Sequence, residues 1–211
     1  MTRKAIGILG AGNVGIALAR AFIAKGESVV LGVPNPDKYR DAVAGLGPGA
    51  RIDTTEAAIE ASDLVILATP YAAALSIARS RPDWGNRILV DATNPLAAGL
   101  AGLSVGTTTS GAEEIAKAAR GARVVKAFNT TGAENMADSR YAGGAVFMPV
   151  CGDDAEARNR VIALATLIGF DAVDLGDLKV ARYLEPFAMT WIHMAILLGH
   201  GRSFAFGRLR R

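Results

Sequence analysis

The stretch Ile6 to Gly15, IGILGAGNVG, decides the fold of this chain. An apolar run ends at Gly10, and Gly12 and Gly15 complete a Gly-x-Gly-x-x-Gly turn that opens a helix. In this arrangement the first glycine allows a tight turn. The second lets backbone N–H groups approach a pyrophosphate at the helix N-terminus, and the third lets the helix pack on the strand. A glycine turn can also be purely structural, but its place between a strand and a helix favours a dinucleotide site.

Short β-rich runs alternate with helical runs along most of the chain. The expected strands cover 5–9, 28–31, 64–68, 88–90 and 123–127. This alternation predicts an α/β protein with a Rossmann-type, doubly wound parallel sheet covered by helices on both faces. After residue 148 the pattern changes to a helix over 153–168, a strand over 172–175 and a long helical tract from 177. We therefore expect a dinucleotide-binding domain over 1–149 and a small C-terminal α/β domain over 150–211 that ends in long helices.

Helix starts and a helix breaker are also visible. Short polar side chains suited to capping a helix stand before a first-turn proline or three residues before a glutamate, at Asn35 with Pro36, Asp53 with Glu56, and Ser110 with Glu113. Pro186 should kink or divide the C-terminal helical tract. The run 187–198 is apolar nearly all round, so we expect it to be buried, in a dimer interface or over a cofactor.

The composition favours a soluble, cytoplasmic domain. Its 211 residues are 51% hydrophobic, which is ample for a core. The charge of +3 comes from Arg202, Arg208, Arg210 and Arg211; without them 19 basic residues face 20 acidic ones, so no nucleic-acid partner is expected, although the tail could meet another anion. The N-terminus has no signal-peptide pattern, and the run 187–198 is too short to span a membrane. The single cysteine, Cys151, is interpreted as a buried structural thiol.

The end of the second strand bears on the choice of nucleotide. It reads Val33-Pro34-Asn35, with no carboxylate about 20 residues beyond the glycine turn, where NAD sites usually carry one. Lys38 and Arg40 follow and could meet a 2′-phosphate, or simply lie exposed on a helix. We predict NADP as the cofactor.

The ends of the later strands carry small polar residues and prolines, namely Thr69-Pro70, Asn94-Pro95-Leu96 and Asn129-Thr130. Open α/β sheets bind ligands at this edge. The sequence shows no Ser/His/Asp set and no metal-ligand spacing, so neither a catalytic nucleophile nor a metal is expected. His193 is interpreted as a core or interface residue. Hydride transfer between stacked rings suits what remains, because the protein then supplies alignment.

Six segments together resemble one known family. They are GAGNVG at 10–15, DATNPL at 91–96, TTSGAEE at 108–114, VVKAFNT at 124–130, VCGDD at 150–154 and ARYLEP at 181–186. In this order they resemble the coenzyme F-dependent NADP oxidoreductases, the deazaflavin family. The resemblance implies a homodimer that passes hydride between NADPH and a small-molecule co-substrate, the deazaflavin coenzyme F420 or a flavin.

The resemblance also implies site residues. It assigns the pyrophosphate to Gly10, Gly12, Asn13 and Val14 beside Gly15, the nucleotide to Thr69 and Pro70, the nicotinamide to Asn129, Thr130 and Ala133, and the deazaflavin to Asn94, Pro95, Leu96 and the helix 194–197. Pro34 stands where family members often place an arginine for the 2′-phosphate, which weakens the expected NADP preference.

Two other functions remain open at this point. One is a non-catalytic NADP(H)-sensing interaction protein, and the other is an NAD(P)-dependent dehydrogenase of a small organic substrate. The dehydrogenase usually needs a larger helical substrate domain with a catalytic lysine, for which 150–211 is short. An open space beside the nicotinamide would favour an enzyme over a sensor.

Overall fold

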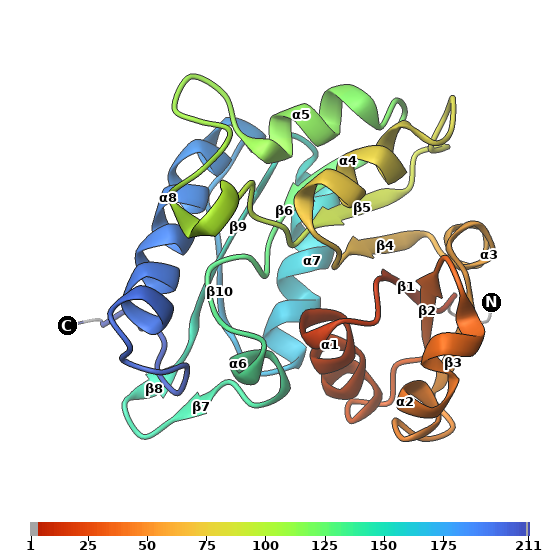
Figure 1. Cartoon of the computed structure of the whole chain (residues 1–211), viewed down its shortest axis with the longest axis horizontal. Coiled ribbons are helices and arrows are strands. Elements are labelled where there is room, and N and C mark those ends of the chain that lie inside the picture. Colours follow the sequence, from red (N-terminus) through yellow and green to blue (C-terminus); the bar gives the residue numbers. More distant parts are fainter. Residues whose placement is uncertain (1–3, 210) are drawn as a thin grey trace.

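A single large sheet forms the centre of the protein (Figure 1). The computed structural model describes residues 4–209 and 211; Arg210 of the basic tail and residues 1–3 of the N-terminal stretch lie outside the described residues. The sheet has the order β10-β9-β6-β5-β4-β1-β2-β3. Its strands are β1 (Ile6–Leu9), β2 (Val29–Val33), β3 (Ala50–Thr54), β4 (Leu64–Leu67), β5 (Ile88–Asp91), β6 (Arg123–Lys126), β9 (Phe147–Gly152) and β10 (Asp171–Asp174). A small hairpin of β7 (Arg140–Tyr141) and β8 (Gly144–Ala145) stands apart from it.

Helices cover both faces of this sheet. They are α1 (Asn13–Ile23), α2 (Arg40–Ala44), α3 (Thr55–Glu60), α4 (Tyr71–Arg79), α5 (Gly111–Ala118), α6 (Glu134–Ala137), α7 (Ala155–Leu167) and α8 (Ala181–Ile192), with a π-helical turn at His193–Leu197 and 3₁₀ turns at Pro36–Tyr39, Ala98–Leu100 and Leu178–Val180. One core cluster packs α1 and α7 against the sheet, and another packs α3, α4, α5 and α8 against the opposite face. Successive strand residues alternate between these clusters, as Val30 and Leu31 do. The predicted doubly wound α/β fold is confirmed.

The strand order reverses beside β1. From β1 the chain moves outward to β2 and β3, then returns to the other side of β1 for β4, β5 and β6, all in parallel register. Open α/β sheets bind ligands where the order reverses, outside the carboxyl ends of the strands. Beyond β6, β9 runs antiparallel and β10 lies parallel to β9. The expected boundary between residues 149 and 150 falls inside β9, so both predicted domains contribute to one sheet, and the division stays a prediction.

Two expectations about helix ends need correction. Ser110 caps α5 as predicted, accepting a hydrogen bond from the Glu113 amide at 3.2 Å. The cap of α3, however, is Thr54 and not Asp53, because β3 extends through residue 54 and places that hydroxyl beside the first turn. Pro186 lies inside α8, so it does not divide the helix there, and a kink at this residue stays a prediction.

The apolar run 187–198 is buried on one side only. Trp191 and Ala195 pack inward, whereas Ile196, Leu197 and Leu198 are 41%, 48% and 58% exposed. In residues 4–209 and 211, no helix has both the length and the apolar character needed to cross a membrane.

Candidate active site

The three glycines of the turn after β1 have different surroundings. Gly10 has a φ of +112°, and a Cβ there would lie 2.6 Å from the Ala68 carbonyl oxygen. A Cβ on Gly15 would lie 2.0 Å from the Gly10 carbonyl oxygen, so α1 packs directly on the turn. At Gly12 a Cβ would meet no atom of the described residues within 4 Å. Gly10 and Gly15 are therefore fixed by packing, whereas Gly12 faces open space at the start of α1.

A cleft of about 310 Å³ lies beside this helix start. Gly12, Asn13 and Ile16 line one side, and Ala133 and Glu134 of the α6 region line the other. The structure thus brings Ala133, which follows β6, to the glycine turn that follows β1. Glu134 is held at this edge by Arg202, whose guanidinium lies 3.2 Å from its carboxylate.

Three polar side chains that follow β4 and β6 each have a buried oxygen without a hydrogen-bond partner. In the described part of the chain, Thr69 Oγ1, Asn129 Oδ1 and Thr130 Oγ1 have no hydrogen bond. An unpaired buried polar atom costs about 1–3 kcal/mol, and such atoms mark sites where something else supplies the bond. All three residues were predicted from the sequence to contact the nucleotide, so their unmatched oxygens fit a polar ligand at this edge.

The backbone before Asn129 is strained. Phe128 has a φ of +62°, which is rare for an aromatic residue and costs about 1–3 kcal/mol. Its ring is buried in edge contacts with Phe22 and Phe170, and its amide donates to Met148 Sδ at 3.1 Å. Packing thus holds the strained turn that presents Asn129.

Asn94 and Asn129 join the ends of β5 and β6. The side-chain amide of Asn94 donates to the backbone carbonyl oxygen of Asn129 at 2.9 Å, and the side-chain amide of Asn129 donates to Asn94 Oδ1 at 3.0 Å. Asn129 also donates to the Leu184 carbonyl oxygen of α8 at 3.3 Å. These bonds fix the orientation of the Asn129 amide, because its nitrogen faces two acceptors and its oxygen is left unmatched.

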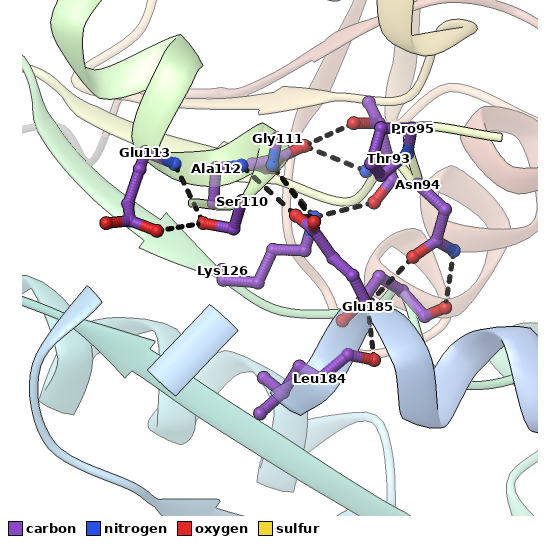
Figure 2. A network of polar contacts seen from close by, with 12 residues as sticks. Thr93, Asn94, Pro95, Ser110, Gly111, Ala112, Glu113, Lys126, Leu184 and Glu185 are labelled. Atoms are coloured by element: carbon purple, nitrogen blue, oxygen red, sulfur yellow. Dashed lines mark hydrogen bonds and ion pairs between the residues drawn. The ribbon is translucent and has the colours of Figure 1, made fainter. Parts of the chain in front are cut away.

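A buried ionic cluster lies under these asparagines (Figure 2). The Lys126 ammonium donates to Asp91 Oδ2 at 2.8 Å, to the Thr93 carbonyl oxygen at 2.7 Å and to Glu185 Oε1 at 3.0 Å. All three charged side chains are at most 1% exposed. Burial alone would lower the pKa of Lys126, but the charges of Asp91 and Glu185 outweigh it and raise the pKa above its ordinary value.

The negative charge of Glu185, the second carboxylate of this cluster, is stabilised by the N-terminus of α5. Glu185 accepts hydrogen bonds from the amides of Gly111 and Ala112, at 2.9 and 3.1 Å. These N–H groups lie in the first turn of α5, where they have no partner within the helix and where the helix dipole favours negative charge. The cluster therefore connects β5, β6, α5 and α8 at a single point. Sequence reasoning missed it as a unit, although charged residues directly after the apolar runs of β5 and β6 are a usable signal.

The residues predicted to meet the adenosine lie at the end of β2. Val33 is buried, whereas Pro34, Asn35 and Lys38 are exposed. Because β1 and β2 pair in register, this exposed end lies beside the glycine turn. Arg40 forms an ion pair with Asp37.

A second, apolar pocket of about 690 Å³ lies between the loop after β5 and α8. Leu100 and Leu103 line it from the loop, and Met189, His193 and Met194 line it from α8 and its π-helical turn. Its size is within the range of small-molecule sites. His193, expected in the core or an interface, is exposed in this wall. Asn94, Pro95 and Leu96 precede the loop but do not line the pocket.

Cys151 is buried on β9, where it pairs with Lys126 of β6. Burial raises the pKa of its thiol to about 12. A thiol with this pKa stays protonated and is a poor nucleophile. The predicted structural role is consistent with this environment.

The glycine turn, the strand-order reversal and the unmatched polar groups define a dinucleotide-binding α/β protein. Comparison with known proteins identifies the group. The family model described as NADP oxidoreductase, coenzyme F420-dependent, matches residues 5–95. The crystal structure of a protein from Arthrobacter sp. FB24, assigned as an F420-dependent NADP reductase, has 30% identity and a TM-score of 0.88, and the match covers 98% of this chain and 100% of that one. The chain belongs to the coenzyme F420-dependent NADP oxidoreductase family.

Two curated proteins extend the comparison. The F420-dependent NADP reductase of Methanothermobacter thermautotrophicus is 28% identical over 211 residues, which cover 93% of this chain and 90% of that protein. The rat metalloreductase STEAP3 is 31% identical over 185 residues, and the match covers 87% of this chain but only 36% of STEAP3. The predicted resemblance is confirmed, and the chain is an NADP-dependent oxidoreductase.

Proposed function

We propose that this protein transfers hydride between NADP(H) and a flat deazaflavin or flavin ring bound in the apolar pocket. The observation that carries the proposal is the position of that pocket. Its loop wall begins a few residues after Asn94, which hydrogen-bonds to Asn129 at the strand ends. This position supports a nucleotide and a second ring bound along the same edge of the sheet.

The described residues fit a pyridine nucleotide. Gly12 leaves room for a diphosphate at the start of α1, and Asn13, Val14 and the packed turn at Gly10 and Gly15 surround that position. Thr69 and Pro70 follow β4, the neighbour of β1, and Thr69 carries an unmatched oxygen. NADPH, when bound, supplies the hydride. The role of these residues is to hold the nucleotide along the strand ends.

Asn129, Thr130 and Ala133 are proposed to surround the nicotinamide. The unmatched oxygens of Asn129 and Thr130 suit a hydrogen-bond donor such as a carboxamide. Ala133 lines the cleft beside Gly12 and presents only a methyl group there. These residues would thus hold the nicotinamide by its carboxamide edge and leave one face of the ring open to the acceptor.

The apolar pocket is proposed to hold the acceptor. Its walls are mostly apolar, so they suit the face of a flat ring, and hydride transfer between aligned rings needs no protein nucleophile. Leu96 pairs with Leu103 in a β-bridge, so Asn94, Pro95 and Leu96 act on the acceptor by shaping this loop. Met194 and Leu197 contribute from the π-helical turn.

The NADP preference is proposed to rest on the exposed end of β2. Pro34 brings no charge there, so Lys38 is the residue we assign to the 2′-phosphate, with Val33 and Asn35 shaping the turn beside it. The exposed apolar side chains Ile196, Leu197 and Leu198 suit a homodimer contact. We expect the dimer to act in the cytoplasm.

The test is spectroscopic. NADPH and the protein should together bleach the visible band of the deazaflavin, with saturation in both substrates. Deuterium placed on one face of the nicotinamide should transfer, and deuterium on the other face should not. A Met189→Trp variant fills the pocket and should stop turnover while NADPH still binds. If NADPH binds tightly but neither deazaflavin nor flavin is reduced, the proposal is wrong and a sensor is favoured.

A further inference from the structure

We infer that the buried cluster of Asp91, Lys126 and Glu185 sets the position of the acceptor pocket relative to the nucleotide. This inference rests on the proposed function. The three residues are positioning residues, because none of them lines the pocket or the cleft beside Gly12. They act through the two chain segments that form the pocket walls.

The helical wall of the pocket starts at the cluster. Glu185 is bound to Lys126 at 3.0 Å, and the next residue, Pro186, already lines the pocket. Met189 and His193 follow at spacings of three and four residues, which places them on the same face of the helix. A movement of Glu185 therefore moves the whole apolar face of α8.

The loop wall starts at the same cluster. Asp91 accepts hydrogen bonds from the Thr93 amide at 2.9 Å and from its hydroxyl at 2.7 Å, while the Thr93 carbonyl accepts from Lys126. Asn94 follows directly and bonds to Asn129. The loop then returns to this point, because the Ser104 amide donates to the Pro95 carbonyl oxygen at 2.7 Å. Both walls are thus tied to one ammonium group.

Docking of α8 does not depend on this cluster alone. Arg182, one turn earlier in α8, forms two hydrogen bonds to the Glu113 carboxylate of α5, at 2.7 and 2.9 Å. Buried ion pairs are also poor stabilisers compared with apolar side chains, because desolvation offsets their attraction. This buried cluster adds little stability, but one ammonium group holds Asp91, the Thr93 carbonyl and Glu185 in fixed positions. Such a cluster is suited to aligning the segments that carry these groups. The Arg182–Glu113 pair joins the same two helices and provides a matched control.

The experiment compares Glu185→Gln and Lys126→Met with Arg182→Met. In Glu185→Gln we expect kcat/KM for the deazaflavin to fall roughly tenfold or more, since small misplacements of reacting groups have effects of this size. The KM and Kd for NADPH should stay within about twofold of the wild type, because the glycine turn is untouched. Arg182→Met should change the acceptor kinetics by no more than about twofold. Glu185→Gln retains the neutral Lys126–Asp91 pair, so it tests the inference independently of the more disruptive Lys126→Met.

Amide hydrogen exchange gives a readout that needs no acceptor. In Glu185→Gln, residues 97–107 and 186–197 should exchange faster than in the wild type, whereas residues 6–23 should not. If both pocket walls exchange at the same rate in Glu185→Gln as in the wild type, the inference is wrong. This readout holds even if the wild type reduces no acceptor and the proposed function itself is wrong. Acceptor kinetics that match the wild type, or an equal loss in Arg182→Met, would also overturn it.

Discussion

Replacement of Gly12 by alanine should weaken nucleotide binding strongly with almost no effect on folding. Gly12 has a φ of −82° and a ψ of −172°, an extended conformation that alanine adopts freely. The new Cβ would meet no atom of residues 4–209 and 211 within 4 Å. The only space that it takes is the space we assign to the pyrophosphate.

The expected effect on stability is small because two contributions offset each other. Gly12 is the N-cap of α1, and alanine is a poorer N-cap by about 0.5–1 kcal/mol. Alanine also reduces the entropy of the unfolded chain, which stabilises the protein by about 0.4–1 kcal/mol. The free energy of unfolding should therefore stay within about 1 kcal/mol of the wild type.

The expected effect on binding is much larger. A hydrogen bond from a backbone amide to a charged group contributes about 1.5–3 kcal/mol. A methyl group at Gly12 would displace the diphosphate from at least two such amides at the start of α1, a loss of about 3 kcal/mol or more. The Kd for NADPH should rise by about a hundredfold or more, since every 1.4 kcal/mol or so is a factor of ten.

Urea unfolding and NADPH fluorescence titration measure the two effects separately. Gly45→Ala is the matched control, because Gly45 also has a negative φ, of −66°, and its nearest contact would be an ordinary 3.7 Å to the Ala42 carbonyl oxygen. This control should bind NADPH like the wild type. An unchanged Kd in Gly12→Ala, with the fold intact, would refute the assignment of the pyrophosphate to this turn.

Three further outcomes follow from single residues. Gly15→Ala should lower the melting temperature and destabilise by about 1–3 kcal/mol or more, because its Cβ would lie 2.0 Å from the Gly10 carbonyl oxygen; an unchanged melting temperature contradicts this packing. Cys151 should resist alkylation in the native state and react once urea unfolds the protein. Because burial raises its pKa from 9.0 to about 12, the stability that it contributes should be lost as the pH rises through that range. Pro34→Arg should increase the ratio of NADPH to NADH affinity, and an equal ratio would place the 2′-phosphate elsewhere.

The sequence predicts the strands that carry a strong apolar signal. The runs around β1, β4 and β5 are buried on both faces of the sheet, and continuous apolar residues mark such strands. The strand β3 was missed because Ala50–Thr54 is an edge strand with only partial burial and no clear alternation. Its pairing with β2 also explains why the cap of α3 falls on Thr54 and not on Asp53. Tertiary pairing overrides a weak local signal in both cases.

The ionic cluster shows a different limit. Lysine and glutamate are almost always solvated, so the charged residues after the apolar runs of β5 and β6 are only a weak signal for burial, and nothing near Glu185 in the sequence predicts that it is buried. Asp91 and Lys126 are 35 residues apart but lie opposite each other in the paired strands β5 and β6, and Glu185, 59 residues beyond Lys126, reaches them only through the return of α8. Only the assembled fold shows that the charges compensate each other.

The two halves of the site therefore differ in how far the sequence specifies them. The nucleotide half depends on local geometry, because Gly10, Gly12 and Gly15 determine which backbone amides are exposed and where the helix starts. The half that we propose for the acceptor depends on distant segments, since the loop near Leu100 and the helix near Met189 form a pocket only when they pack together. A local pattern can be recognised in a single sequence. A pocket between a loop and a helix that are far apart in the chain has no such local pattern. Substitutions in the loop and in α8 can consequently change which acceptor is preferred without any change to the glycine turn.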